Sequence, residues 1–187
     1  MLRSRTYPAA SRFFAPTEDE DVKIFAGSGS CTAFAEDDGA AEFVRERDNG
    51  NLDKARQLGC ALAGQLGRLW RPGDSGLRLD QKKVLFAYAV ARVAEQQCAG
   101  SVLRQAVVGE FQREVCARRP RDGSIIQDSA AFTKYLLAER SGTEALGQVF
   151  AELCGARGST RLQGRGAALY RRYAGICNGL FAKISFQ

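Results

Sequence analysis

Beyond about residue 50, apolar side chains recur every three or four positions along the chain. Residues at that spacing share one face of an α-helix, so each such stripe predicts a helix packed against a core. The cleanest stripe runs from Leu162 to Ile184 and predicts a final helix over about residues 160–184. No alternating pattern of the kind that strands require competes in this part of the chain. The pattern predicts an all-α fold, a compact array or bundle of about six helices.

One predicted helix is apolar on every side. Its middle runs without a charge from Val84 to Ala91. A helix with no polar face is normally central and buried, so this segment is the expected centre of the core. Asp80 is the expected N-cap of this helix. Residues 99 and 100 predict its end, and Ser101 predicts the start of the next helix.

Local signals divide the rest of the helical region. Asp128 and Thr143 are expected to cap two further helices, because short polar side chains accept hydrogen bonds from the free N–H groups of a first turn. Residues 118–123 are basic and contain Pro120, and they predict a loop. Gly59 and two other glycines interrupt the first stripe, where each weakens a helix by up to ~1 kcal/mol relative to alanine. The members of that stripe are Leu58, Leu62, Leu66 and Leu69.

The first 50 residues lack a sustained stripe. Thr17 and Glu20 form a capping-box pattern that predicts a short helix, which the glycines of residues 27–30 end. A second, weak helix is expected over about residues 38–47, followed by a turn. The chain is therefore predicted to have two parts: a less regular N-terminal arm, residues 1–50, docked on a helical domain, residues 51–187.

The amino-acid composition limits which catalytic and metal-binding sites the chain can form. The 187 residues contain no histidine, which removes the commonest general base and the commonest metal ligand. No spacing of Cys, Asp or Glu matches a zinc site or a calcium loop, and no glycine-rich segment matches a phosphate loop. We therefore expect no catalytic residue, no metal and no cofactor, and we interpret the chain as non-enzymatic.

Cysteine usage and hydropathy indicate the compartment. The six cysteines are widely separated, and five lie in or beside apolar helical patterns, which favours reduced structural thiols. No apolar run approaches the ~20 residues of a membrane span. The N-terminal segment lacks the apolar core of a secretory signal. A cytoplasmic location without a membrane partner is the default expectation.

Charge is unevenly distributed along the chain. Glu152 is the last acidic residue, and six cations follow it, as many as the formal net charge of +6. On a helical wheel, four of these cations flank the apolar stripe, where they can follow a phosphate backbone with Tyr170 available for stacking. The alternative is that arginine stems cover apolar surface while the charges stay in water. The anion-binding candidates are Arg161, Arg165, Arg172 and Lys183 on the last helix, and Arg118, Arg119 and Arg121 in the predicted loop.

Three functions remain open at this point. The leading hypothesis is a non-catalytic helical module for protein–protein interaction or self-association, because the helical core is strong and catalytic equipment is missing. The second is binding of nucleic acid or another polyanion through the Arg-rich last helix. The third is a ligand or enzyme pocket between helices, whose sign would be convergence of Tyr88, Arg92, Glu95 and Tyr135. Aromatic anchors for a protein partner would be Phe13, Phe14 and Trp70.

Overall fold

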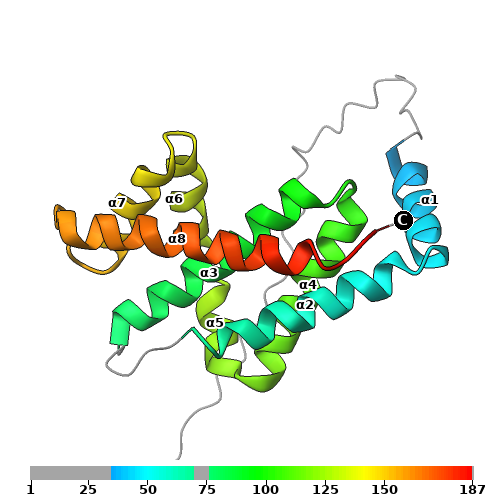
Figure 1. Ribbon diagram of the computed structural model, residues 1–187, viewed down its shortest axis with the longest axis horizontal. Helices are drawn as coiled ribbons and strands as arrows, with labels where there is room; N and C mark the ends of the chain where they lie inside the picture. Colours follow the sequence, from blue (N-terminus) through cyan, green and yellow to red (C-terminus); the bar gives the residue numbers. More distant parts are fainter. Residues whose placement is uncertain (1–34, 70–75, 187) are drawn as a thin grey trace, which may run out of the picture. The chain divides into compact units, whose positions relative to one another are not determined.

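Every regular element in the described part of the chain is an α-helix. The structure is a computed structural model that describes residues 35–69 and 76–186 (Figure 1). The all-α prediction is therefore confirmed. The short helix predicted after Thr17, and the residues Phe13, Phe14 and Trp70, lie outside the described residues. In chain order the helices are α1 (Ala35–Asp48), α2 (Asn51–Leu66), α3 (Gly76–Gln97), α4 (Ser101–Arg118), α5 (Pro120–Ile126), α6 (Ser129–Glu139), α7 (Thr143–Leu153) and α8 (Thr160–Phe181).

Helix α3 forms the centre of this array, as its uniformly apolar middle predicts. Residues 81–90 are all buried, and α3 contacts every other described helix except α1. Phe86 lies edge-on to Tyr173 of α8, with ring centroids 5.3 Å apart. It also contacts Phe111 of α4 at 6.1 Å. One side chain of α3 thus contacts both α4 and α8, and the buried residues of helices α2 to α8 form one continuous core.

Two helix pairs pack closely because glycines remove side chains at their crossings. At Gly59 of α2, an added methyl group would lie 2.7 Å from the carbonyl oxygen of Val107 on α4. At Gly166 of α8, it would lie 2.7 Å from Cβ of Phe150 on α7, and Gly147 of α7 is equally crowded by the backbone of α8. The helix-weakening effect expected of Gly59 is thus offset by close helix packing.

The basic segment at residues 118–123 is not the loop that its composition predicts. Helix α4 continues to Arg118, and α5 begins at Pro120 after a single intervening residue. Proline is well suited to the first position of a helix because its missing N–H has no partner there in any case. The Asp122 side chain in the first turn accepts a 2.7 Å bond from Lys83 of α3, which ties the short helix to the centre.

The structure also differs from the sequence-based prediction at three helix ends. Helix α3 begins at Gly76, so Asp80 lies inside it and does not cap it. Gly142, with φ +96°, occupies the N-cap before α7, and Thr143 is the first helical residue. Helix α8 ends at Phe181, three residues before Ile184. The predicted Asp128 cap is confirmed, since its side chain accepts a 3.1 Å bond from the Ala131 N–H.

Candidate functional site

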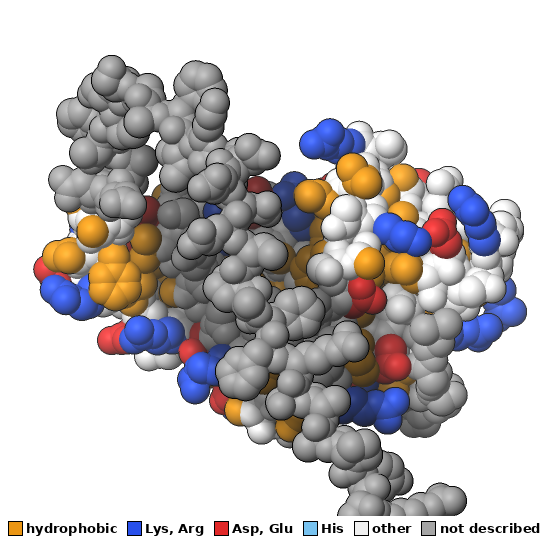
Figure 2. Space-filling model, turned by 180° about the vertical axis from the view of Figure 1, so that it is seen from behind, with side chains coloured by type: hydrophobic (Ala, Val, Ile, Leu, Met, Phe, Trp, Pro, Cys, Tyr) orange, Lys and Arg blue, Asp and Glu red, His pale blue; other side chains and the backbone are white. Residues whose placement is uncertain are grey.

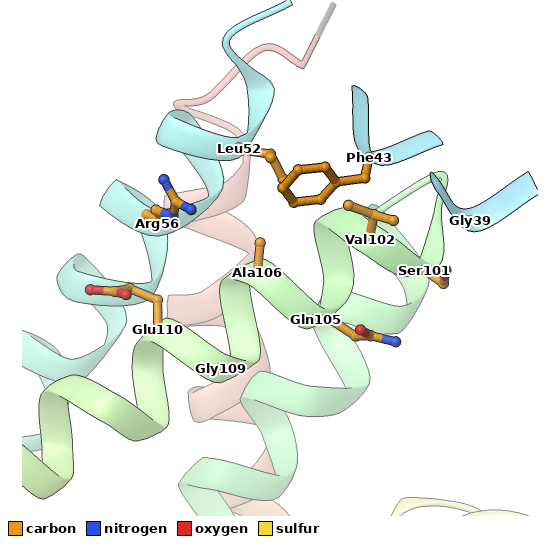
Figure 3. A pocket seen from close by; sticks show the side chains of 10 residues that line it. All are labelled: Gly39, Phe43, Leu52, Arg56, Ser101, Val102, Gln105, Ala106, Gly109 and Glu110. Carbon is orange, nitrogen blue, oxygen red and sulfur yellow. The ribbon is translucent and has the colours of Figure 1, made fainter. Parts of the chain in front are cut away.

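An open apolar groove lies between α1, α2 and α4. It has a volume of about 530 Å³. Figure 3 shows the Phe43 ring reaching from α1 toward Leu52 of α2, above Val102 and Ala106 of α4. Phe43 and its neighbour Val44 each remain 45% exposed. Two large apolar side chains therefore remain in contact with solvent beside a concave surface.

Helix α1 is held over the groove by polar contacts to both neighbouring helices. The Glu42 carboxylate accepts bonds from the Val102 backbone N–H at 3.3 Å and the Ser101 hydroxyl at 3.4 Å. Since Gly100 at the N-cap has no side chain to cap α4, this carboxylate satisfies a free donor of its first turn. At the other end of α1, Asn51 donates a 2.6 Å bond to Glu46.

The outer ridge of α4 separates this groove from a second one. The second groove, about 420 Å³, lies between α3 and α4 and shares Gln105 and Gly109 with the first. A methyl group at Gly109 would have no neighbour within 4 Å in the structure. A glycine in a helix interior costs up to ~1 kcal/mol relative to alanine. At Gly109 no internal packing offsets that cost, in contrast to Gly59.

Glu110, on the polar rim of the first groove, forms a thiol–carboxylate contact. Cys60 of α2 donates a 3.2 Å hydrogen bond to Glu110 of α4. Burial, and then this bond, raise the pKa of the Cys60 thiol. Arg113 donates to the same carboxylate at 2.9 Å and lowers the pKa of Glu110. The rim therefore presents an ionised carboxylate, and the thiol bonded to it stays protonated and weakly nucleophilic.

A second polar cluster joins α3, α6 and α8 around Glu139. Its carboxylate accepts hydrogen bonds from the Tyr88 hydroxyl at 2.9 Å and the Tyr170 hydroxyl at 3.4 Å. The Arg92 guanidinium forms an ion pair with it at 2.6 Å. Burial, followed by the interaction with Glu139, raises the pKa of both tyrosines, that of Tyr170 to about 12. These tyrosines therefore stay protonated and serve as hydrogen-bond donors.

The four residues considered for an interhelical pocket do meet at this cluster. Arg92 pairs with Glu95 as well as with Glu139, and the Tyr135 ring packs on Tyr88 with centroids 5.2 Å apart. The Tyr135 hydroxyl is buried and has no hydrogen-bond partner among the described residues. Most of the charged and polar atoms pair with one another, which is an arrangement that stabilises a fold. Sequence reasoning missed Glu139, whose position in the last turn of α6 carries no distinguishing local signal.

The four candidate cations of the C-terminal region remain at the surface. Arg161, Arg165, Arg172 and Lys183 are all exposed, the first three on α8 and Lys183 two residues after it. Other cations of this region are neutralised: Arg171 pairs with Glu144, and Arg157 lies 3.7 Å from Glu152. Tyr170 is half-buried and bonded to Glu139, so its ring is not free for stacking.

The three candidates of the predicted loop lie on other elements. Arg118 ends α4 and pairs with Glu114 at 3.0 Å, while Arg119 lies 3.8 Å from Asp122. Arg121 is exposed on α5. Neither α4 nor α5 contacts α8, so these arginines are not packed together with those of α8. On the face shown in Figure 2, the visible Lys and Arg side chains are scattered and interleave with Asp and Glu.

The remaining chemistry of the described residues is limited. Their five cysteines are free thiols, and burial raises the pKa of Cys98 to about 11 and that of Cys177 to about 12. Within the same residues, no three His, Cys, Asp or Glu side chains are grouped to hold a metal ion. A search of the described helices finds none with the length and apolar character needed to cross a membrane.

Comparison with known proteins gives no relative. No protein-family model, curated protein or solved structure matches the chain.

Proposed function

We propose that this chain is a non-catalytic helical module that binds an α-helix of another protein in the groove between α1, α2 and α4. The observation that carries the proposal is Phe43, an aromatic side chain 45% exposed beside the apolar surface of Leu52, Val102 and Ala106. Aromatic side chains, Phe included, are enriched in protein interfaces relative to the rest of the protein surface.

The lining of the groove has the composition of a protein interface. Its centre is apolar, and its rim carries Arg56, Gln105 and Glu110. Protein interfaces combine an apolar core with a polar rim in this way. The groove is also bounded by helices, which suits an amphipathic helix with apolar side chains at positions i, i+3, i+4 and i+7.

Gly109 supports a helix as the occupant. It faces solvent on the ridge beside the groove, and nothing in the structure fills the space above it. A helix backbone can approach most closely where a side chain is missing. The free-energy cost of this glycine is explained if a partner's backbone packs against it.

Selection from a library of helical peptides, with the full chain as bait, tests the proposal without knowledge of the natural partner. We expect selected peptides to share the i, i+3, i+4, i+7 apolar spacing. Their affinity should fall at least tenfold in Phe43→Ser, which removes the anchor, and in Ala106→Phe, which fills the groove. Leu137→Ser is the matched control, because Leu137 is 60% exposed on α6 and does not line the groove.

Three outcomes would overturn the proposal. The first is a failure to select any binder. The second is equal loss of affinity in Leu137→Ser and Phe43→Ser. The third comes from sedimentation of the protein alone: a dimer that Phe43→Ser dissociates would make a second copy of the chain the occupant.

A further inference from the structure

The outward side of α8 is a stripe without acidic or large apolar side chains. Its members are spaced four, three, four, three and four residues apart, which keeps them on one side of the helix. All are exposed, whereas the opposite side of α8 buries Leu162, Tyr173 and Phe181. We call this surface the α8 stripe; it consists of Arg161, Arg165, Ala168, Arg172, Gly175 and Gly179.

The positive charge of the α8 stripe is not fully neutralised within the fold. No acidic residue follows Glu152 in the sequence, and Glu152 is already shared between Lys134 at 2.8 Å and Arg157 at 3.7 Å. Neither Arg161 nor Arg172 forms an ion pair with a described residue. An anionic partner can therefore bind these two guanidinium groups without first displacing a carboxylate.

The side chains of the stripe favour phosphate over a protein partner. A protein interface needs apolar anchors at its centre, and Ala168, Gly175 and Gly179 supply none. Contacts to a nucleic-acid backbone need only cations that replace counterions, and the guanidinium fork matches phosphate oxygens. Small side chains between the arginines also let a rigid partner approach the helix closely.

The described part of α8 has no aromatic ring available for stacking, which favours double-stranded over single-stranded nucleic acid as the partner. Single strands are held largely by stacking of bases on aromatic side chains. The described aromatic residues of α8 do not offer this, because Tyr170 is bonded to Glu139 and Tyr173 and Phe181 are buried. We propose that the α8 stripe binds the phosphate backbone of double-stranded nucleic acid without reading its sequence.

The dimensions of the stripe agree with this partner. Arg161 and Arg172 are eleven residues apart, which is about 16 Å along a helix at 1.5 Å per residue. That length spans roughly five phosphates of one strand at 3.4 Å each. This surface is separate from the groove of α1, α2 and α4, so each proposal can fail without the other.

Fluorescence anisotropy with a labelled 30-base-pair DNA duplex tests the inference. If the two cations without an ion pair, Arg161 and Arg172, replace counterions, the slope of log K against log salt should be about −1.8, equivalent to about a 12-fold loss of affinity from 50 to 200 mM. The triple variant Arg161→Gln, Arg165→Gln, Arg172→Gln should lose at least tenfold in affinity at 50 mM. The control triple, with the same change in net charge, is Arg47→Gln, Arg118→Gln, Arg121→Gln, and it should stay within threefold.

A single substitution provides a second test that keeps every arginine. Ala168→Glu places a carboxylate in the middle of the stripe, within i±3 and i±4 reach of Arg165 and Arg172. It should preserve the circular dichroism spectrum and melting temperature and still weaken duplex binding at least fivefold.

Other results would overturn the inference. These are no binding at 50 mM salt, equal losses in the two triple variants, or unchanged binding in Ala168→Glu. Tighter binding of a single strand of the same length would also contradict it. So would competition by poly-glutamate as effective as that by duplex at the same charge concentration, since this would indicate an acidic protein partner.

Discussion

Two buried tyrosines of the core differ in how their hydroxyl groups are satisfied. The Tyr88 hydroxyl donates to Glu139 at 2.9 Å, whereas the Tyr135 hydroxyl has no partner among the described residues. A hydrogen bond to a charged group contributes about 1.5–3 kcal/mol, and an unpaired buried polar group costs free energy. The hydroxyl group of Tyr88 therefore stabilises the fold, whereas that of Tyr135 destabilises it.

This contrast predicts different effects of the same substitution. Tyr88→Phe should lower the free energy of unfolding by about 1.5–3 kcal/mol, because the half-buried Glu139 carboxylate loses a hydrogen-bond donor. Tyr135→Phe should leave it unchanged or raise it slightly. Urea unfolding followed by circular dichroism measures both. Equal destabilisation by the two variants would mean that a buried water or another group bonds the Tyr135 hydroxyl.

At the scale of the helix, the glycines fall into two sets with different physical roles. Gly59, Gly147 and Gly166 lie at helix crossings where a methyl group has no room. Gly164, Gly175 and Gly179 are exposed on α8, and nothing lies within 4 Å of a methyl group at any of them. The sequence alone shows only that all six interrupt helical patterns. The partner backbone that crowds three of them comes from another part of the chain.

Alanine substitution should separate these two sets. Gly175→Ala should stabilise the protein by up to ~1 kcal/mol, since alanine is the better helix former and the space is open. Gly147→Ala should destabilise it by about 1–3 kcal/mol, because the methyl group forces α7 and α8 apart. Thermal melts of the two variants, compared with the parent chain, provide the measurement. Destabilisation by Gly175→Ala would contradict the open space that the structure shows around this position.

The helices could be predicted from the sequence where the periodic apolar stripe was strong. They could not be predicted where contacts with distant parts of the chain determine whether a helix forms. The apolar run from Val84 to Ala91 is sufficient to place α3 at the centre. Helix α5 was missed because residues 118–123 are basic and contain a proline, which is typical of a loop, and because the Lys83–Asp122 bond that holds the helix joins residues 39 apart in the chain. The groove beside Phe43 was missed for the same reason: it exists only when α1 packs on α2 and α4. Apolar residues at positions 43 and 44 of a weak helix were the available signal.

At the scale of the whole molecule, a buried thiol and a half-buried tyrosine hydroxyl, both protonated in the folded protein, make stability depend on pH. Burial raises the pKa of the Cys177 thiol from 9.0 to about 12, and that of Tyr170 from 10.0 to about 12. The unfolded chain therefore releases these protons at lower pH than the folded protein does. Their contribution to stability is fully present below about pH 9 and is lost as the pH rises from 9 toward 12.

Alkaline unfolding is therefore expected to depend on Cys177. Between pH 8 and pH 10 this fully buried thiol alone should lower the free energy of unfolding by about 1 kcal/mol, since one pKa unit corresponds to 1.36 kcal/mol. Urea titrations at pH 8, 9 and 10 measure the loss, and Cys177→Ala should reduce it by that amount while also lowering stability at pH 8 through the small cavity. If Cys177→Ala has the same pH dependence as the parent chain, the thiol is accessible to water in the folded protein, and α8 is less firmly packed on the core than its burial indicates.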